Sequence, residues 1–214
     1  LGDGRIKRFK KEECRFAYRK SFFRTQLRGK YLITEVELLL PRRTEAEVKY
    51  EEIKRELGSP RAPLKEIRDC VLELRRKKGM LRSKEHSALR SVGCFFTNPY
   101  VSGETFERLK SLFGKEAEIP AFPTEKGKFK IPAAFLIEKA GFPRGYTEGC
   151  VAISQHHALC LVNLGKARAF DILNLARKIQ EKVHLLFGIL LEPEPVLVGF
   201  RREDVPLERA TFLP

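Results

Sequence analysis

Hydrophobic and polar residues alternate between residues 31 and 40, where Glu35 and Glu37 would share one face of an extended chain. The residues of the opposite face are Thr34, Val36, Leu38 and Leu40. A period of two residues is typical of a strand with one buried face. We therefore expect a β-strand over residues 31–40, and a shorter strand over residues 5–9.

Five later segments carry the signals of helices. Thr44 and Glu47 have the spacing of a capping box, and Gly58 would end the helix that they begin. Ser102 is a suitable N-cap for a helix that bears Phe106, Leu109 and Leu112. The other three are a helix with Ile67, Val71 and Leu74 that ends at Gly79, a helix over residues 133–140 between Pro132 and Gly141, and a helix over residues 170–187 before Gly188.

Apolar strands are expected at residues 150–153 and 159–162, on either side of a loop that carries His156 and His157. Residues 189–191 and 196–199 are also apolar, and they bracket the sequence Glu192-Pro193-Glu194-Pro195. Residues 119–130 are rich in proline, glycine and lysine, which favours a loop. This mixture of helices and strands predicts the α+β class.

The composition is that of a globular protein. At 214 residues with 43% hydrophobic residues, the chain can bury a proper core, which excludes general disorder. No apolar run is long enough to span a bilayer, so we expect no membrane association. The five cysteines are scattered, without a Cys-x-x-Cys pair, and no third ligand is evident near the paired histidines. The sequence thus indicates neither a disulfide framework nor a metal site, and it favours a reducing cytoplasm.

Positive charge is concentrated near the beginning of the chain. The net charge is +14, and residues 1–30 hold eleven Lys and Arg against three Asp and Glu, with a second basic cluster at residues 75–78. Such a surface attracts nucleic acids or small molecules that carry phosphates, although a solvated face is the ordinary outcome of a charge run. Aromatic and basic residues interleave over residues 16–23, which fits either a base-stacking surface or a core loop.

The stretch from Ser91 to Pro99 combines a glycine, a thiol, two phenylalanines and an Asn-Pro pair. It fits the wall of a ligand pocket, or a short core strand that ends in a turn with Cys94 as a small apolar residue. Glu194, locked between two prolines, is either a constrained and poorly solvated carboxylate or an exposed loop residue. The paired histidines fit a structural or surface role better than metal binding.

Six blocks of sequence, taken together and in order, resemble the UDP-N-acetylenolpyruvoylglucosamine reductase (MurB) family, in the type with a tyrosine loop. The resemblance extends from about Gly4 to Phe200. The blocks are Tyr18-Arg19-x-Ser21, Lys78-Gly79-Met80, Ser91-x-Gly93-Cys94-Phe95-Phe96-Thr97-Asn98-Pro99, Ala134-Phe135-Leu136-Ile137-Glu138-x-Ala140-Gly141, His157-Ala158-Leu159 through Asn163, and Phe187-Gly188 through Leu191-Glu192-Pro193-Glu194.

The resemblance implies a flavoenzyme of peptidoglycan precursor synthesis, which uses NADPH and FAD to reduce the enolpyruvyl group of a UDP-sugar to UDP-N-acetylmuramate. Cys94 matches the family serine that protonates the carbanion, while Arg19 and Glu194 match the residues that polarise the enolpyruvyl carboxylate. A thiol is a stronger acid than a hydroxyl, so Cys94 should donate a proton well but make activity sensitive to oxidants. The implied substrate-binding residues are Tyr18, Tyr50, Lys78, Asn98 and His157, and the implied flavin-binding residues are Arg19 and Ser21.

The resemblance also implies a domain organisation. Residues 1–80 would be the tail of an α+β flavin-binding domain, residues 81–188 a smaller α+β substrate-binding domain, and residues 189–214 a return segment that carries Glu194. The glycine-rich segment that cradles the flavin diphosphate in the family has no counterpart here, so we expect a C-terminal fragment of a monomeric, cytoplasmic enzyme. Two alternatives remain: a basic nucleic-acid-binding module and an inactive remnant of the reductase.

Overall fold

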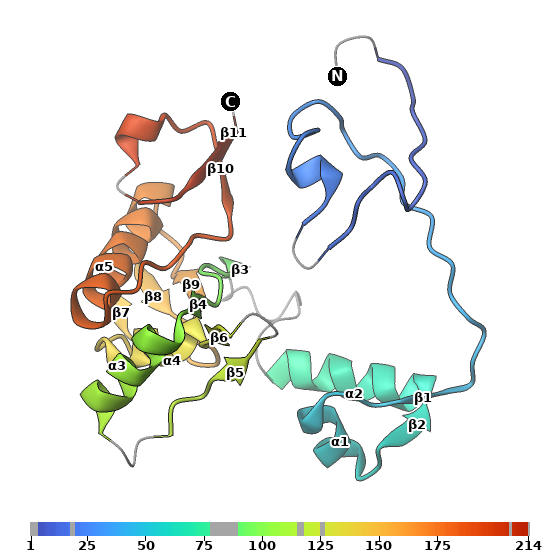
Figure 1. Cartoon of the computed structure of the whole chain (residues 1–214), viewed down its shortest axis with the longest axis horizontal. Helices are drawn as coiled ribbons and strands as arrows, with labels where there is room; N and C mark the ends of the chain where they lie inside the picture. The colour runs from blue at the N-terminus through green and yellow to red at the C-terminus, as the bar shows by residue number, and fades with distance from the viewer. Residues whose placement is uncertain are drawn as a thin grey trace. The chain divides into compact units, whose positions relative to one another are not determined.

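The structure is a computed structural model that describes residues 4–17, 20–77, 90–114, 118–124, 127–205 and 207–213. The chain forms two compact units, Leu1–Thr44 and Glu45–Pro214 (Figure 1). It mixes helices with strands, as the α+β prediction requires. The expected boundary at residues 80 and 81 lies outside the described residues, so the division into a flavin domain and a substrate domain stays a prediction.

In the first unit, the regular element within the described residues is the short 3₁₀-helix η1 (Phe22–Arg24). Phe9, Phe23 and Tyr31 form an aromatic cluster with ring centroids 5.0 to 6.3 Å apart. Phe16, in contrast, is 64% exposed. The packing of Phe23 favours the core-loop interpretation of residues 16–23 over a continuous base-stacking surface.

The strands expected over residues 5–9 and 31–40 are absent, so both predictions were wrong. Residues 31–40 are exposed throughout, including Leu39, whose side chain has no measurable burial. A half-buried strand forms only where a neighbouring strand takes its hydrogen bonds and a core covers its apolar face. The described part of the chain supplies neither a partner strand nor a covering core to residues 31–40. The alternating pattern by itself therefore does not form a strand.

The second unit begins with a small hairpin and two helices. Strand β1 (Glu45–Glu47) pairs antiparallel with β2 (Arg61–Pro63), and helices α1 (Glu51–Leu57) and α2 (Leu64–Lys77) complete this part. The capping box expected at Thr44 and Glu47 was therefore wrong, because pairing with β2 holds Glu47 in a strand. The end of α1 at Gly58 and the helical stripe of α2 are confirmed.

An antiparallel sheet in the order β3-β9-β8-β7 forms the centre of the second unit. Its strands are β3 (Arg90–Cys94), β9 (Cys160–Asn163), β8 (Val151–Ile153) and β7 (Thr147–Glu148). The long helix α5 (Ala169–Phe187) contacts β8 and β9 through its apolar stripe. Strands β8 and β9 and helix α5 confirm the predictions for these segments, with boundaries shifted by no more than one residue.

Strand β3 contains a bulge. Ser91 pairs with Val162, but the next pair is Cys94 with Cys160, so β3 has one more residue than β9 between the two pairs. Gly93 lies in the bulge with φ +81°, a conformation that favours glycine. Because side chains alternate between the faces of a strand, the extra residue puts Ser91 and Cys94 on the same face.

A second small sheet, in the order β4-β6-β5, follows the central one. It consists of β4 (Tyr100–Val101), β6 (Phe129–Lys130) and β5 (Phe122–Pro123). The loop expected over residues 119–130 thus contains two short strands. Helices α3 (Gly103–Phe113) and α4 (Ala133–Lys139) are confirmed, and Ser102 Oγ accepts the N–H of Thr105 as the predicted cap of α3.

The residues after α5 belong to the same hydrophobic core. Ile189, Leu191 and Leu197 are buried with the side chains of the central sheet and α5. Strand β10 (Val196–Val198) confirms the later apolar segment and pairs in parallel with β11 (Thr211–Leu213), after the 3₁₀-helix η2 (Arg202–Asp204). No strand forms over residues 189–191.

Gln180 ties this last segment to α5. Its side chain is 2% exposed and donates hydrogen bonds to the carbonyl oxygens of Leu191 (2.8 Å) and Glu208 (3.0 Å). It also accepts the N–H of Glu208 at 3.0 Å. The side-chain amide of Gln180 therefore satisfies three backbone groups, which belong to two separate segments of the chain.

None of the helices in the described ranges is both long enough and apolar enough to cross a membrane.

Candidate functional site

Cys94 is the last residue of β3, and its side chain is half-buried. The two residues that follow, Phe95 and Phe96, are 2% and 1% exposed, with ring centroids 5.1 Å apart. Their burial anchors the end of the strand, at about 1.5–3 kcal/mol for each ring. The thiol therefore lies at the edge of the core, as the core-strand alternative expects, while the pocket-wall alternative stays a prediction.

The Phe96 segment pairs with the Leu-Glu-Pro-Glu segment. Phe96 forms an antiparallel bridge with Pro193. Thr97 N–H donates to the carbonyl oxygen of Glu192 at 2.9 Å, and Glu194 N–H donates to that of Phe95 at 2.8 Å. Two segments about a hundred residues apart in the sequence are thus held side by side. Glu194 is paired with Phe95, the residue that follows Cys94.

The side chain of Glu194 is exposed, so the expectation of a poorly solvated carboxylate was wrong, and the loop alternative holds for its solvation. Its backbone is nevertheless fixed by the bond to Phe95 and by the prolines on either side. The neighbouring Glu192 forms an ion pair with Arg209 at 2.7 Å. The return segment is therefore held on both of its sides while Glu194 faces solvent.

Three side chains with reactive atoms converge beside β3. Cys94, His157 and Cys160 each present a sulfur or ring nitrogen, and these atoms lie within 4.8 Å of one another. Cys160 is buried, whereas Cys94 and His157 are half-buried. The sequence spacing showed no third ligand near His157, but the pairing of β3 with β9 supplies two thiols. Cys160 was missed for this reason, since only the sheet register brings it to Cys94.

The two thiols affect one another. The hydrogen bond with Cys94, burial and the nearby charge of Cys94 all raise the pKa of the Cys160 thiol, so Cys160 stays protonated far above neutral pH. His157 Nδ1 accepts the backbone N–H of Leu159 at 3.1 Å. In the neutral imidazole the proton is therefore on Nε2.

Asn98 has a structural partner. Its Oδ1 accepts the N–H of Ala133 at 2.8 Å and so satisfies one of the free N–H groups at the start of α4. Pro132 precedes that helix and offers no side-chain cap. The Asn-Pro sequence thus connects the Cys94 segment to α4.

Of the other predicted site residues, Tyr50 and Ser21 lie within the described part of the chain. Tyr50 is 74% exposed and precedes α1, without a side-chain cap bond there. Ser21 lies in the first unit, where its hydroxyl accepts the N–H of Arg24 at 3.3 Å. Tyr18, Arg19 and Lys78 lie outside the described residues.

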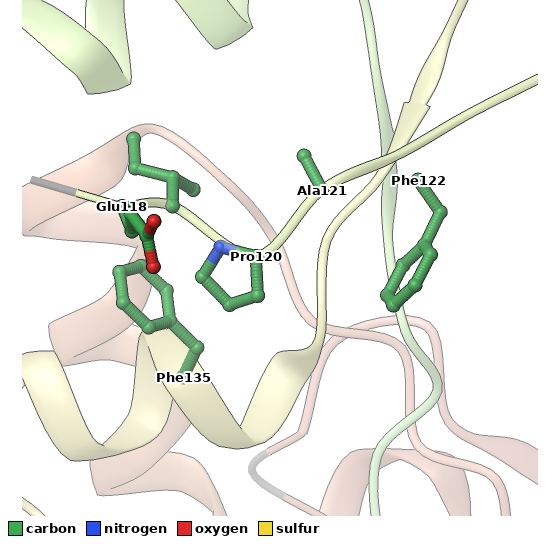
Figure 2. Close-up of a pocket in the computed structure, with 6 residues that line it drawn as sticks. Glu118, Pro120, Ala121, Phe122 and Phe135 are labelled. Carbon is green, nitrogen blue, oxygen red and sulfur yellow. The ribbon is translucent and has the colours of Figure 1, made fainter. Parts of the chain in front are cut away.

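The hollows of the surface lie elsewhere. One, with a volume of about 640 Å³, is lined by residues 118–122 and by Phe135 of α4. Figure 2 shows Phe135 beneath the segment that carries Pro120, with Glu118 and Phe122 at its two ends. A second hollow, of about 320 Å³, lies beside α1 between Glu52, Arg55 and Glu56. Neither is lined by a residue of the Cys94 cluster.

The sequence-family model for the C-terminal domain of UDP-N-acetylenolpyruvoylglucosamine reductase matches residues 84–198, just over half of the chain. A reductase of that name from Thermobifida fusca is 43% identical over 195 residues, which cover 87% of this chain and 54% of the relative. The reductase from Streptomyces coelicolor is 40% identical over 196 residues, covering 87% and 51%. The chain thus spans about half the length of the curated relatives it matches.

Among solved structures, the chain is similar to UDP-N-acetylenolpyruvylglucosamine reductase (MurB) from Thermus caldophilus. The identity is 28%, the match covers 62% of this chain and 34% of that chain, and the TM-score is 0.34. A TM-score of this size does not by itself support a shared fold. The similarity in sequence is the stronger finding.

Proposed function

Since this chain belongs to the UDP-N-acetylenolpyruvoylglucosamine reductase family, we propose that it is the substrate-side part of such a reductase and that Cys94 is its proton donor. The substrate is the enolpyruvyl ether of UDP-N-acetylglucosamine, and the product is UDP-N-acetylmuramate, a precursor of peptidoglycan. The observation that carries the proposal is the pairing of Phe95 with Glu194, which joins two blocks of the family motif next to the Cys94 thiol.

The residues described here do not by themselves fit FAD. The sequence has no glycine-rich segment to cradle a diphosphate, and Ser21 is the one residue assigned to the flavin by the family resemblance that lies among the described residues. We therefore assign FAD and NADPH to the reductase as a whole and attribute no step to them in this chain.

Cys94 would act after the double bond has been reduced. The carbon next to the substrate carboxylate then carries the negative charge, and the S–H bond breaks as its proton passes to that carbon. Glu194 would act on the carboxylate side of the same site, where its exposed side chain can meet a ligand that approaches from solvent. Arg19 would supply the positive charge that stabilises the anionic intermediate.

His157 and Asn98 would hold the nucleotide part of the substrate, as would Tyr50, Tyr18 and Lys78. His157 lies within 4.8 Å of Cys94, so a phosphate bound by its imidazole would be close to the proton donor. The net charge of +14 provides long-range attraction for a UDP-sugar. Nucleic-acid binding is the weaker alternative, because it gives no role to the pairing of Phe95 with Glu194 beside the Cys94 thiol.

The test uses the protein expressed with the coding sequence that flanks this chain, and follows NADPH oxidation with the enolpyruvyl UDP-sugar. Cys94→Ala should lower kcat by about 10²–10⁴-fold, the usual contribution of a positioned acid. Cys94→Ser is the matched control, because it restores the residue that the family resemblance implies and should retain most of the activity. Equal rates for the wild type and Cys94→Ala would overturn the assignment of the proton donor.

A further inference from the structure

The cluster beside β3 contains a second thiol that the proposed reaction does not use. Cys160 is 7% exposed and lies directly across from Cys94, its partner in the antiparallel pair of β3 and β9. None of the five cysteines, all within the described residues, forms a disulfide in the structure. A buried thiol that faces a half-buried one raises the question of whether the two can react with each other.

The hydrogen bonds of the sheet show how close the two residues are. Phe95 N–H donates to the carbonyl oxygen of Leu159 at 2.8 Å, and these are the residues after Cys94 and before Cys160. In an antiparallel pair, a bond at that position identifies Cys94 and Cys160 as a non-hydrogen-bonded pair. Such pairs have Cα atoms about 4.5 Å apart and their side chains close together. This separation falls within the range of about 4.4–6.8 Å that disulfides span.

From this geometry we infer that Cys94 and Cys160 form a reversible disulfide when the protein meets a peroxide. The disulfide itself depends only on the sheet register. Its consequence for activity rests on the proposed function, since an oxidised Cys94 has no proton to donate.

The reaction has two steps. The Cys94 thiol gives up its proton and the thiolate attacks a peroxide oxygen, so an S–O bond forms and the O–O bond breaks, which oxidises the sulfur to a sulfenic acid. The departing hydroxide takes up the proton that the thiol lost and leaves as one water. Cys160 sulfur then attacks Cys94 sulfur, so the S–S bond forms, the S–O bond breaks and the second water leaves. In total, two thiols and one hydrogen peroxide give one disulfide and two waters.

The accessibility and the protonation of the two thiols determine the order of the two oxidation steps. Cys94 is the more accessible sulfur, so it meets the peroxide first. The hydrogen bond to Cys94, burial and the charge of Cys94 raise the pKa of Cys160 and keep it protonated, but oxidation of Cys94 to a neutral sulfenic acid removes the charged partner of that hydrogen bond. The second thiol is thus released to react only after the first has been oxidised.

A metal ion is the competing use of this cluster, and the contacts disfavour it. Nδ1 of His157 already accepts the Leu159 N–H, so binding a metal through either ring nitrogen would disturb that bond. Only three ligand atoms converge here among the described residues, whereas structural zinc sites use four. A disulfide needs no group other than the two sulfurs.

The experiment treats the purified, reduced chain with hydrogen peroxide, blocks free thiols by alkylation, and maps tryptic peptides without reduction. The expected product links the peptide of residues 91–108, which holds Cys94, to that of residues 145–166. The second peptide contains both Cys150 and Cys160, so Cys150→Ser is the matched control and should keep the link, whereas Cys160→Ser should abolish it. Dithiothreitol should release the two peptides.

Three results would overturn the inference: no 91–108 to 145–166 link, a link that survives Cys160→Ser, or stoichiometric zinc in the purified chain that prevents oxidation. Activity is then measured separately in the reductase with its flanking sequence. A disulfide that forms without loss of turnover would contradict the role of Cys94 as proton donor, but not the disulfide. Loss of the link in an enzyme that still depends on Cys94 would contradict only the disulfide.

Discussion

The backbone N–H of Glu194 donates a hydrogen bond to the carbonyl oxygen of Phe95 at 2.8 Å. The partner residue of this bond directly follows Cys94, and Glu194 directly follows Pro193, which bridges to Phe96. The thiol and the carboxylate that the family resemblance places in one reaction are thus on paired segments. Whatever moves the return segment should therefore alter the site, and Gln180 is the side chain that holds this segment to α5.

Replacing Gln180 with leucine should lower the free energy of unfolding by about 2–4 kcal/mol. The substitution removes the partner of the buried carbonyl oxygen of Leu191, at about 1–3 kcal/mol for a buried orphaned group, together with two part-buried hydrogen bonds to the backbone of Glu208. Urea unfolding followed by circular dichroism measures the change. Glu181→Gln, at the next and exposed position of α5, should change it by less than about 0.5 kcal/mol. A loss below 1 kcal/mol for Gln180→Leu would show that the return segment is held by other contacts.

Asn98 has a structural role that can be separated from its proposed binding role. Asn98→Ala removes the acceptor for Ala133 N–H and should cost about 1 kcal/mol of unfolding free energy. Asn98→Asp keeps an acceptor oxygen at the positive end of α4, so its stability should match the wild type. If the amide also donates to the nucleotide, Asn98→Asp should raise KM for the UDP-sugar at unchanged stability. Equal KM values for the wild type and Asn98→Asp would remove Asn98 from the binding site.

The raised pKa of Cys160 predicts lower stability in alkali. The folded protein keeps the Cys160 proton above pH 9, the ordinary value for this thiol, whereas the unfolded chain loses it. The contribution is therefore fully present below that pH and is lost as the pH rises, by about 1.4 kcal/mol per pH unit. Urea unfolding at pH 8 to 10.5 with a reductant present should show this extra loss in the wild type relative to Cys160→Ser. Parallel pH profiles for the two proteins would contradict the shifted titration.

Two glycines should respond in opposite ways to alanine. Gly93 has φ +81° in the bulge, so Gly93→Ala should cost about 1–2 kcal/mol even though a Cβ would meet no atom within 4 Å. Gly103, in the first turn of α3, also has open space around a Cβ but ordinary helical geometry. Gly103→Ala should therefore stabilise the protein by about 0.5–1 kcal/mol. Thermal unfolding of both variants tests the pair, and equal effects would mean that backbone strain at Gly93 is not the cause.

The helices of this chain could be predicted from sequence because their signals are local. Ser102, Gly58 and Gly188 each act on the turn next to them, and all three appear at the expected helix ends. No strand forms over residues 31–40, because a strand needs a pairing partner, and the hydrophobic pattern of a segment cannot supply one.

The candidate site could be predicted only in part, for the same reason. Cys94 and Glu194 were identified through blocks of motif, and their segments are indeed paired. Cys160 could not be found in this way, because its closeness to Cys94 depends on the pairing of β3 with β9 and on the bulge. The capping box at Thr44 and Glu47 shows the converse error, since a correct local signal was overridden by pairing with β2.

The single extra residue in β3 decides which sulfur chemistry this site can have. If the same residues paired with β9 without the bulge, Gly93 would lie across from Cys160, and the thiol of Cys94 would point to the opposite face of the sheet. The cysteine at the end of β3 would then be oxidised without a resolving partner. Sensitivity to peroxide would change from a recoverable loss of activity to permanent damage, through a change of pairing that removes no residue of the site.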